Sequence, residues 1–198
     1  MNISESKEMR VGLVVMASGE SRRFGRNKLM EPLCGKPLIA WILDATEGLF
    51  DERVVVTRSK EVFELAKTRG IDCVSHALPY RSDTVRLGME ALSGLVDFCF
   101  FVPGDQPLLQ RESLLRFVAK AKQRPDCILR AEYNGVVGSP IGFPSRYFPQ
   151  LSALPEGKGG NFVARAHPEA VYPVLVEKEY ELWDIDTQED YEKIRTIV

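Results

Sequence analysis

Residues 14–28 read VVMASGESRRFGRNK, an apolar run that ends in a loop with glycines, serines, arginines and a lysine. Such a run is typical of a buried parallel strand, and the loop after it presents backbone N–H groups and cations at one point. This combination suits a polyphosphate better than a neutral ligand. The spacing, G-x-S-x-R-F-G-x-x-K, differs from both the P-loop and the G-x-G-x-x-G dinucleotide pattern. The loop therefore predicts a nucleotide site of a less common kind.

Length and charge limit the possible classes of protein. The chain has 198 residues and a formal net charge of −2. This length predicts one domain, which we place at residues 10–198 behind a loosely held tail at residues 1–9. The near-neutral charge gives no reason to expect a protein that coats nucleic acid.

The cysteines and the apolar segments indicate the compartment. Cys34, Cys73, Cys99 and Cys127 are widely spaced and form no C-x-x-C pair, so we expect free thiols rather than a zinc site or a disulfide scaffold. The polar N-terminus does not resemble a signal peptide, and no apolar run is long enough for a membrane span. These features predict a cytoplasmic protein without a membrane partner.

Apolar segments alternate with amphipathic ones through the first 125 residues. Strands are predicted at 10–16, 53–57, 71–75 and 98–102. Helices are predicted at 37–47 and 60–69, after a cap at Ser82 or Asp83, and around Leu114 and Phe117. Shorter strands follow at 126–132, 136–137, 140–143, 172–176 and 182–185, with a last helix at 188–197. The pattern predicts a three-layer α/β fold with a mostly parallel sheet and some antiparallel strands in its C-terminal half.

Acidic residues follow the predicted strands at two places. Asp105 stands in Gly104-Asp105-Gln106-Pro107, directly after the strand at 98–102. It could cap a helix that begins near Gln110, or bind Mg²⁺, which prefers one or two carboxylates together with phosphate oxygens. Asp184 and Asp186 would share one face of the strand at 182–185. These acids could also be helix caps, or one of them could complete a metal site.

Several segments together resemble one family. Residues 16–38 resemble the signature of the MobA-like nucleotidyltransferases, and the branch with the greatest similarity is molybdenum cofactor cytidylyltransferase. Further matching segments occur in the family's order and lie at 81–88, 104–107, 138–144 and 184–187. The resemblance extends over nearly the whole chain from Val11.

The resemblance implies a Rossmann-like enzyme that transfers CMP from CTP to the terminal phosphate of molybdenum-molybdopterin and releases pyrophosphate. It implies Mg²⁺, with Mn²⁺ as an alternative, and a recipient molybdoenzyme or its chaperone as a further candidate partner. Lys28, Arg23 and Asp105 would be catalytic. The nucleotide would contact Ala17, Ser18, Gly19, Arg23, Lys28, Ser82, Asp83 and Gly104. The acceptor would contact Gly138, Ser139, Lys158 and Gly159. Asp105 would hold the metal, with Asp184 or Asp186 as a second ligand.

The chain departs from the family pattern at three positions. Ser18 stands where cytidine-using members usually have Ala and guanosine-using relatives have Gly. Asp83 adds a negative charge beside a polyanionic ligand, which is unfavourable unless Arg81 or Arg86 neutralises it. Ser139 replaces a more usual His or Asn.

Two alternatives therefore stay open. One is a related nucleotidyltransferase that uses GTP or acts on a sugar or alcohol phosphate, and the other is a non-catalytic module that binds a nucleotide or cofactor. We expect Lys28 to be an exposed loop residue whose loss leaves the fold intact. His76 and His167 are expected to be surface or packing residues rather than catalysts.

Overall fold

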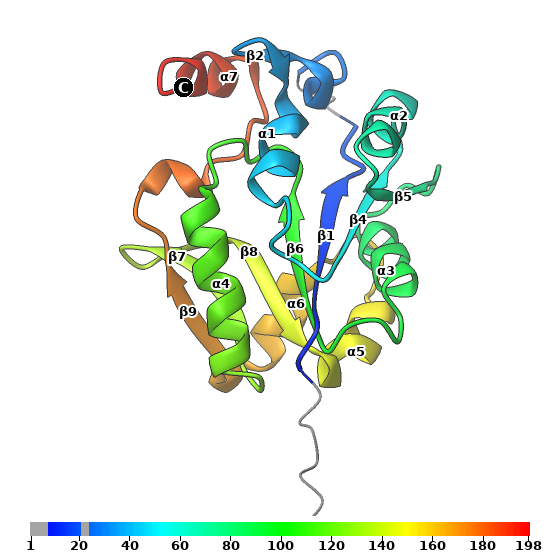
Figure 1. The fold of residues 1–198 in the computed structure, drawn as a ribbon, viewed down its shortest axis with the longest axis vertical. Coiled ribbons are helices and arrows are strands. Elements are labelled where there is room, and N and C mark those ends of the chain that lie inside the picture. Colours follow the sequence, from blue (N-terminus) through cyan, green and yellow to red (C-terminus); the bar gives the residue numbers. More distant parts are fainter. Residues whose placement is uncertain (1–7, 21–23) are drawn as a thin grey trace, which may run out of the picture.

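The computed structural model describes residues 8–20 and 24–198, and within them a seven-stranded sheet forms the centre of the molecule (Figure 1). The strand order is β5-β4-β1-β6-β8-β7-β9. Pairing is parallel from β5 through β4 and β1 to β6. In this sheet β8 is antiparallel to both of its neighbours, whereas β7 and β9 pair in parallel. The predicted mixture of parallel and antiparallel strands is confirmed.

The elements follow the predicted alternation. The strands of the large sheet are β1 (Val11–Ala17), β4 (Glu52–Thr57), β5 (Asp72–Ser75), β6 (Phe98–Pro103), β7 (Ile128–Tyr133), β8 (Val136–Pro144) and β9 (Val171–Leu175). A two-stranded sheet is formed by β2 (Pro32–Leu33) and β3 (Lys36–Pro37). The α-helices are α1 (Leu38–Ala45), α2 (Lys60–Thr68), α3 (Arg81–Ala91), α4 (Arg111–Gln123), α5 (Phe148–Ser152), α6 (Gly160–Ala166) and α7 (Gln188–Arg195). Short 3-10 helices lie at Lys28–Met30, Ser145–Tyr147, Pro168–Ala170 and Glu179–Leu182.

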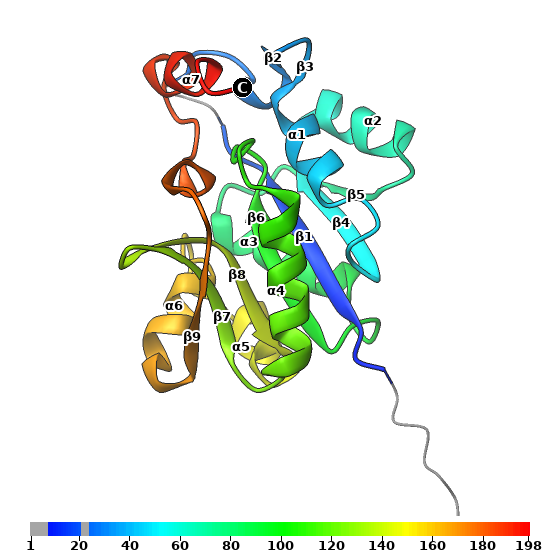
Figure 2. The same ribbon diagram turned by 60° about the vertical axis from the view of Figure 1, so that its left-hand side comes forward.

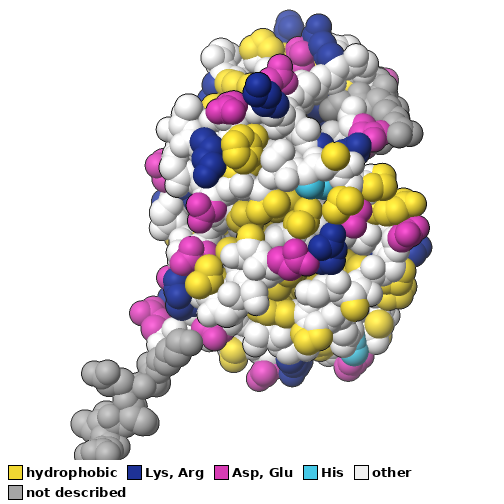
Figure 3. Space-filling model, turned by 90° about the vertical axis from the view of Figure 1, so that its right-hand side faces the viewer, with side chains coloured by type: hydrophobic (Ala, Val, Ile, Leu, Met, Phe, Trp, Pro, Cys, Tyr) yellow, Lys and Arg dark blue, Asp and Glu magenta, His cyan; other side chains and the backbone are white. Residues whose placement is uncertain are grey.

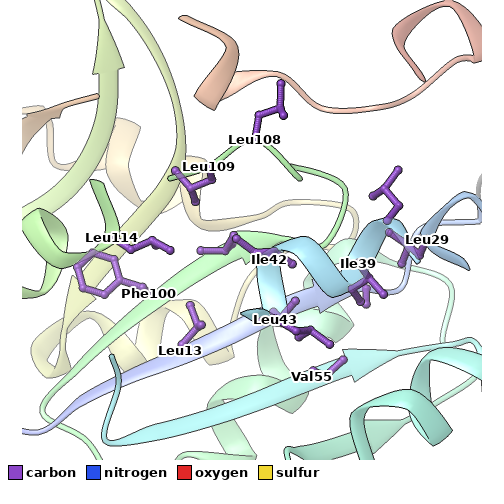
Figure 4. Close-up of a cluster of buried hydrophobic side chains, with 14 of the residues drawn as sticks. Leu13, Leu29, Ile39, Ile42, Leu43, Val55, Phe100, Leu108, Leu109 and Leu114 are labelled. Atoms are coloured by element: carbon purple, nitrogen blue, oxygen red, sulfur yellow. The ribbon is translucent and has the colours of Figure 1, made fainter. Parts of the chain in front are cut away.

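The central strand β1 is apolar on both faces because helices cover the sheet on both sides (Figure 2). Leu13 and Val15 pack into one core with residues of α1, α2 and α4, and Val14 packs into a second core with residues of α3, α5 and α6. Alternate side chains of a strand point to opposite faces, so one apolar run supplies both cores. Figure 4 shows part of the first core, where side chains of β1, α1 and β6 point toward one another.

Helix α3 approaches β1 very closely at Gly88. A Cβ atom on Gly88 would lie 2.6 Å from Cγ1 of Val14, so any larger residue would force the helix away from the sheet. This contact sets the distance between α3 and the middle of β1. It also explains why the segment at 81–88, which carries candidate site residues, includes a glycine.

Several sequence predictions are wrong in detail. Residues 182–185 form no strand, because Glu179–Leu182 is a 3-10 helix and an irregular segment follows it. The N-cap of α3 is Tyr80, not Ser82 or Asp83; the carboxylate of Asp83 instead accepts a hydrogen bond from the Tyr80 N–H at 3.0 Å. The two strands predicted at 136–137 and 140–143 are one continuous strand, β8.

The part of the chain that the structure describes has no helix both long and apolar enough to cross a membrane. On the face seen in Figure 3, positive and negative side chains lie interspersed around a band of hydrophobic ones. No single sign of charge dominates that face.

Candidate active site

A cavity of about 700 Å³ opens beyond the carboxyl ends of the parallel strands. Residues that follow β1, β4 and β6 line it, together with the segment that leads into α3 and the loop before α7. Its lining residues include Ser18, Gly19, Lys28, Arg58, Leu78, Pro79, Tyr80, Arg81, Thr84, Asp105, Asp184 and Asp186. Ligands of open α/β sheets bind at this edge, so the cavity is the candidate active site.

Lys28 lies at the centre of the charged part of this cavity. Its Nζ atom is 2.7 Å from Oδ2 of Asp105 and 3.0 Å from Oδ1 of Asp186, and it also donates a hydrogen bond to the carbonyl oxygen of Ile185. Three segments that are distant in the sequence therefore meet at one ammonium group. The expected proximity of Lys28, Asp105 and the acids near the C-terminus is observed.

The expectation that Lys28 is exposed is wrong. Only 6% of the residue is accessible, because it begins the 3-10 helix Lys28–Met30, where Leu29 is also buried. Burial alone would lower the pKa of Lys28, but the nearby carboxylate of Asp105 and then that of Asp186 outweigh it and raise the pKa. Lys28 is thus a fixed cation with a structural role as well as a candidate functional one.

Backbone hydrogen bonds hold Asp105 against two other segments. The Gly104 N–H donates to the carbonyl oxygen of Met16 at 2.9 Å, and the Ile185 N–H donates to that of Asp105 at 3.0 Å. Helix α4 begins at Arg111, with Gln110 as its N-cap, so Asp105 does not cap this helix. Its side chain faces the cavity, which leaves the ligand interpretation for Asp105.

Asp184 experiences the negative charge of this cluster most strongly. The residue as a whole is exposed, yet protein atoms surround its carboxyl group where it lines the cavity. This local burial, with the charges of Asp105 and Asp186, raises the pKa of Asp184 to about 7.

The acidic cluster suits a divalent cation that is also bound by a substrate. No group of three His, Cys, Asp or Glu side chains within residues 8–20 and 24–198 is arranged to hold a metal ion alone. Mg²⁺ needs no such cage, since it usually combines one or two carboxylates with phosphate oxygens and water. Asp105 and Asp186 share the Lys28 ammonium, and burial together with these two carboxylates raises the pKa of Asp184. A bound cation would relieve this repulsion, so the donor set fits.

The other residues predicted to bind the nucleotide differ in their position and exposure. Ser18, Gly19 and Gly104 lie at the ends of β1 and β6, and a Cβ atom on Gly19 would meet nothing within 4 Å, so a ligand can approach its backbone closely. Ala17 is buried, and its carbonyl oxygen accepts a hydrogen bond from the Thr57 hydroxyl. Arg23 lies outside the described residues.

The segment at the start of α3 presents residues that differ from those predicted. Arg81 and Thr84 line the main cavity, whereas Ser82 and Asp83 line a smaller neighbouring cavity of about 250 Å³. Asp83 lies 3.6 Å from the guanidinium of Arg86, so Arg86 is the residue that offsets its charge. Sequence reasoning considered Arg81 only as a partner of Asp83; its place in the first turn of α3 was the signal for a role in the site.

Another cavity, which we call the second cavity, has a volume of about 200 Å³. It adjoins the main cavity and shares Met16, Arg81 and Pro103 with it. Ser139, Lys158 and Gly159 line this cavity, which brings three of the four predicted acceptor residues together. The fourth, Gly138, does not line it and packs against Leu182 instead. The second cavity also contains Arg165, which the sequence did not single out.

The sequence pattern described as the MobA-like NTP transferase domain matches residues 13–171. The chain belongs to the MobA-like NTP transferase family. This result confirms the resemblance to the MobA-like family and makes the chain a nucleotidyltransferase by family, while the cytidylyltransferase branch stays a prediction.

Two curated relatives match almost the whole MobA-like chain. The purine catabolism protein PucB of Bacillus subtilis (strain 168) is 29% identical over 200 residues, which cover 92% of this chain and 94% of the relative. A protein of Pyrococcus furiosus named "Probable molybdenum cofactor guanylyltransferase" is 30% identical over 197 residues, which cover 93% of this chain and 96% of the relative.

Solved structures show the same fold. Rv0371c of Mycobacterium tuberculosis H37Rv superimposes with a TM-score of 0.85 at 23% identity, covering 96% of this chain and all of that one. A nucleotidyl transferase from Methanothermobacter superimposes with a TM-score of 0.79 at 23% identity, and the match covers 95% of this chain and 97% of that one. The predicted three-layer nucleotidyltransferase fold is therefore confirmed.

Proposed function

We propose that this MobA-like protein transfers CMP from CTP to the terminal phosphate of a molybdopterin-type acceptor and releases pyrophosphate. One observation carries the proposal: the Lys28 ammonium and the carboxylates of Asp105 and Asp186 meet in a cavity that adjoins a second, cationic cavity. An oxygen of the acceptor phosphate forms a bond to the α-phosphorus of CTP. The bond from that phosphorus to the bridging oxygen of the β-phosphate breaks, and pyrophosphate leaves with the electron pair.

The residues in the two cavities suit this reaction. A phosphate monoester is already an anion at neutral pH, so it needs no strong general base, and none of the described cavity residues is a histidine. Positioning and neutralisation of charge then supply the catalysis. The Lys28 ammonium would neutralise negative charge on the triphosphate, and the Gly19 backbone leaves room for a phosphate to approach closely. Arg23, which lies outside the described residues, is proposed as a second cation for the triphosphate.

The metal would belong between the triphosphate and the carboxylates. Asp105 and either Asp184 or Asp186 would hold Mg²⁺ or Mn²⁺, which would neutralise charge that develops on the phosphates. A solved structure of Rv0371c is described as a complex with manganese, which supports a divalent ion in this fold. Lys158 and Arg165 would attract the anionic acceptor into the second cavity.

Ser18 is the observation that favours CTP. The family resemblance implies glycine at this position in guanosine-using members, and a side chain that lines the cavity here leaves less room for a purine. The relatives named as guanylyltransferases favour GTP instead, as the second candidate.

A thermal-shift screen of CTP, GTP, ATP and UTP with Mg²⁺ tests the proposal. A nucleotide present at 100 times its dissociation constant should stabilise the protein by about 2.7 kcal/mol. We expect CTP to raise the melting temperature most, and pyrophosphate to appear only when the acceptor is added. Stabilisation by GTP but not CTP would overturn the cytidylyl assignment, and binding without pyrophosphate release would indicate a non-catalytic module.

A further inference from the structure

A chain of hydrogen bonds joins β1, β4, β5 and the segment before α3 through the side chains of Ser18 and His76. Ser18 Oγ lies 3.1 Å from the carbonyl oxygen of Val56 and 2.8 Å from Nε2 of His76. The Leu78 N–H donates to Nδ1 of the same imidazole at 3.2 Å.

The direction of each bond follows from the donors and acceptors available. A carbonyl oxygen only accepts, so the Ser18 hydroxyl donates its single hydrogen to Val56. Ser18 Oγ must then accept from Nε2–H of His76, while Nδ1 accepts from Leu78. The imidazole is therefore neutral and protonated on Nε2. Burial, and next the charge of Arg58, lower the pKa of His76, which favours the same neutral form.

The charged groups around His76 come from two segments. Arg58 follows β4, whereas Asp83 and Arg86 lie on α3, and of these only Asp83 favours the protonated ring. Two cations and one anion face the imidazole, so the neutral state is maintained from more than one side.

The sheet order places this pair away from the phosphate end of the cavity. Val56 belongs to β4 and His76 follows β5, on one side of β1, while Asp105 follows β6 on the other side. Ser18 and Leu78 both line the main cavity. If the triphosphate lies at Lys28 and Asp105, the base of the nucleotide extends toward Ser18.

We propose that His76 is a positioning residue that presents Ser18 Oγ to the nucleotide base solely as a hydrogen-bond acceptor. The site then selects a base with an exocyclic amino group on the edge that faces Ser18. This inference rests on the proposed function, because it requires a nucleoside triphosphate in the main cavity.

The selection follows from the hydrogen-bonding capacity of one hydroxyl. A serine hydroxyl has one donor and two acceptor positions, and Val56 and His76 occupy the donor and one acceptor. The remaining acceptor position of Ser18 Oγ can pair with an amino N–H of the base. If the base has a carbonyl oxygen in place of the amino group, that oxygen faces Ser18 Oγ and has no hydrogen-bond donor. Such an unpaired contact in a cavity weakens binding about tenfold or more.

Two pairs of nucleotides isolate the amino group. UTP has an oxygen where CTP has the 4-amino group, and ITP lacks the 2-amino group of GTP. Equilibrium binding of all four with Mg²⁺ at pH 8 therefore tests the inference whichever base the enzyme uses. We expect wild-type protein to prefer CTP to UTP, or GTP to ITP, by about tenfold or more.

Three variants separate the roles of the two residues. Ser18→Ala should remove the preference by weakening only the amino-bearing member of the pair. His76→Asn keeps an acceptor near the Nδ1 position but removes the donor to Ser18, so the hydroxyl can turn and the preference should disappear. His76→Gln keeps a donor near the Nε2 position and should retain the preference, with weaker binding of both members because Leu78 loses its acceptor. In turnover, these changes should appear in the KM for the nucleotide far more than in kcat.

A purely structural role would weaken both members of a pair equally in Ser18→Ala, and that result would overturn the inference. Equal binding of both members to wild type, or a preference that survives in His76→Asn, would overturn it too. Melting temperatures measured without nucleotide identify any variant that fails to fold. If Ser18→Ala fails to fold, Ser18→Thr, which keeps the hydroxyl, replaces it. We expect Ser18→Thr to retain the preference, and a loss of preference would contradict the inference. Pyrophosphate release from CTP and UTP alike would reject this inference but keep the proposed function, whereas failure to bind any of the four nucleotides would reject both.

Discussion

Nζ of Lys28 lies 2.7 Å from Oδ2 of Asp105, and this ion pair joins the loop after β1 to the turn after β6. The two strands are parallel neighbours, so the pair closes the gap between their carboxyl ends. Asp186 adds a second carboxylate to the same ammonium group from the segment before α7. A cation that is expected to bind phosphate therefore also holds three parts of the fold together.

Replacing Lys28 with alanine should damage both stability and activity. The substitution leaves Asp105 and Asp186 without their shared cation and the Ile185 carbonyl without its donor. We expect the free energy of unfolding to fall by about 1–3 kcal/mol in urea denaturation, and kcat to fall about 100-fold or more.

Lys60→Ala is the matched control, because Lys60 is exposed at the start of α2 and should change stability by no more than about 0.5 kcal/mol. Mg²⁺ should restabilise Lys28→Ala more than wild type, since the carboxylates then lack a competing ammonium. Equal stability of Lys28→Ala and wild type would show that the ion pairs contribute nothing.

The carboxylates should differ in how they respond to neutralisation. Asp105→Asn should lower pyrophosphate release about 100-fold or more, because Asp105 is fixed by the backbone bonds of Gly104 and Ile185 and faces the cavity. Activity should vanish in excess chelator and return with Mg²⁺ or Mn²⁺. Asp126→Asn, at an exposed carboxylate on the molecular surface, should leave the rate unchanged. Full activity in chelator would remove the metal from the proposal.

Asp184→Asn and Asp186→Asn identify the second ligand. The variant that raises the Mg²⁺ concentration needed for half-maximal activity more strongly marks the residue that binds the ion. Asp184→Asn should also stabilise the protein without metal at pH 8, because it removes a carboxylate whose pKa is raised by burial and by the neighbouring charges. If Asp184→Asn destabilises the protein instead, the ionised carboxylate makes favourable contacts that outweigh its burial and the repulsion from its neighbours.

The fold was predictable because its signals are local. The apolar runs that became β1, β4 and β6 are continuous and alternate with amphipathic segments, so their order implied a mostly parallel sheet. The loop at residues 18–28 follows the first of these runs and Asp105 follows the run at 98–102, so the predicted strands also indicated that both lie at the carboxyl ends of strands.

The remaining details depend on contacts between distant segments. Nothing near Lys28 in the sequence reveals that Asp186 and Ile185 will bury its side chain. The segment at 182–185 has the alternation of a strand. Its backbone instead turns toward Asp105, and the Ile185 N–H donates to the carbonyl oxygen of Asp105 rather than to a neighbouring strand. Likewise, the bond between Ser18 and His76 arises only because β5 packs beside β4, so no local sequence pattern connects the two residues.

Arg81 should connect the two substrates. Its side chain lines both cavities, and its charge lowers the pKa of Asp184, partly opposing the stronger effects of burial and the neighbouring carboxylates. We therefore expect Arg81→Ala to raise the KM for the acceptor about tenfold and to lower kcat, since this guanidinium would lie between the two phosphate groups. Arg195→Ala is the control, because Arg195 is exposed at the end of α7, lines neither cavity and pairs with the nearby Glu192. Equal effects of the two substitutions would place Arg81 outside the reaction.

The stability of the protein should depend on pH through His76. Burial, and then Arg58, lower the pKa of this imidazole in the folded state, so between that pKa and 6.5 the unfolded chain binds more protons than the folded one. Stability then increases with pH through this window; the contribution of His76 is fully present above about pH 6.5 and is lost as the pH falls. Urea denaturation between pH 5 and 8 should show a smaller advantage of wild type over His76→Gln at the acid end. In NMR titrations, the imidazole signal that disappears in His76→Gln should have a midpoint below 6.5. A midpoint above 6.5 would mean that the ring is protonated more easily than its bonds to Ser18 and Leu78 allow.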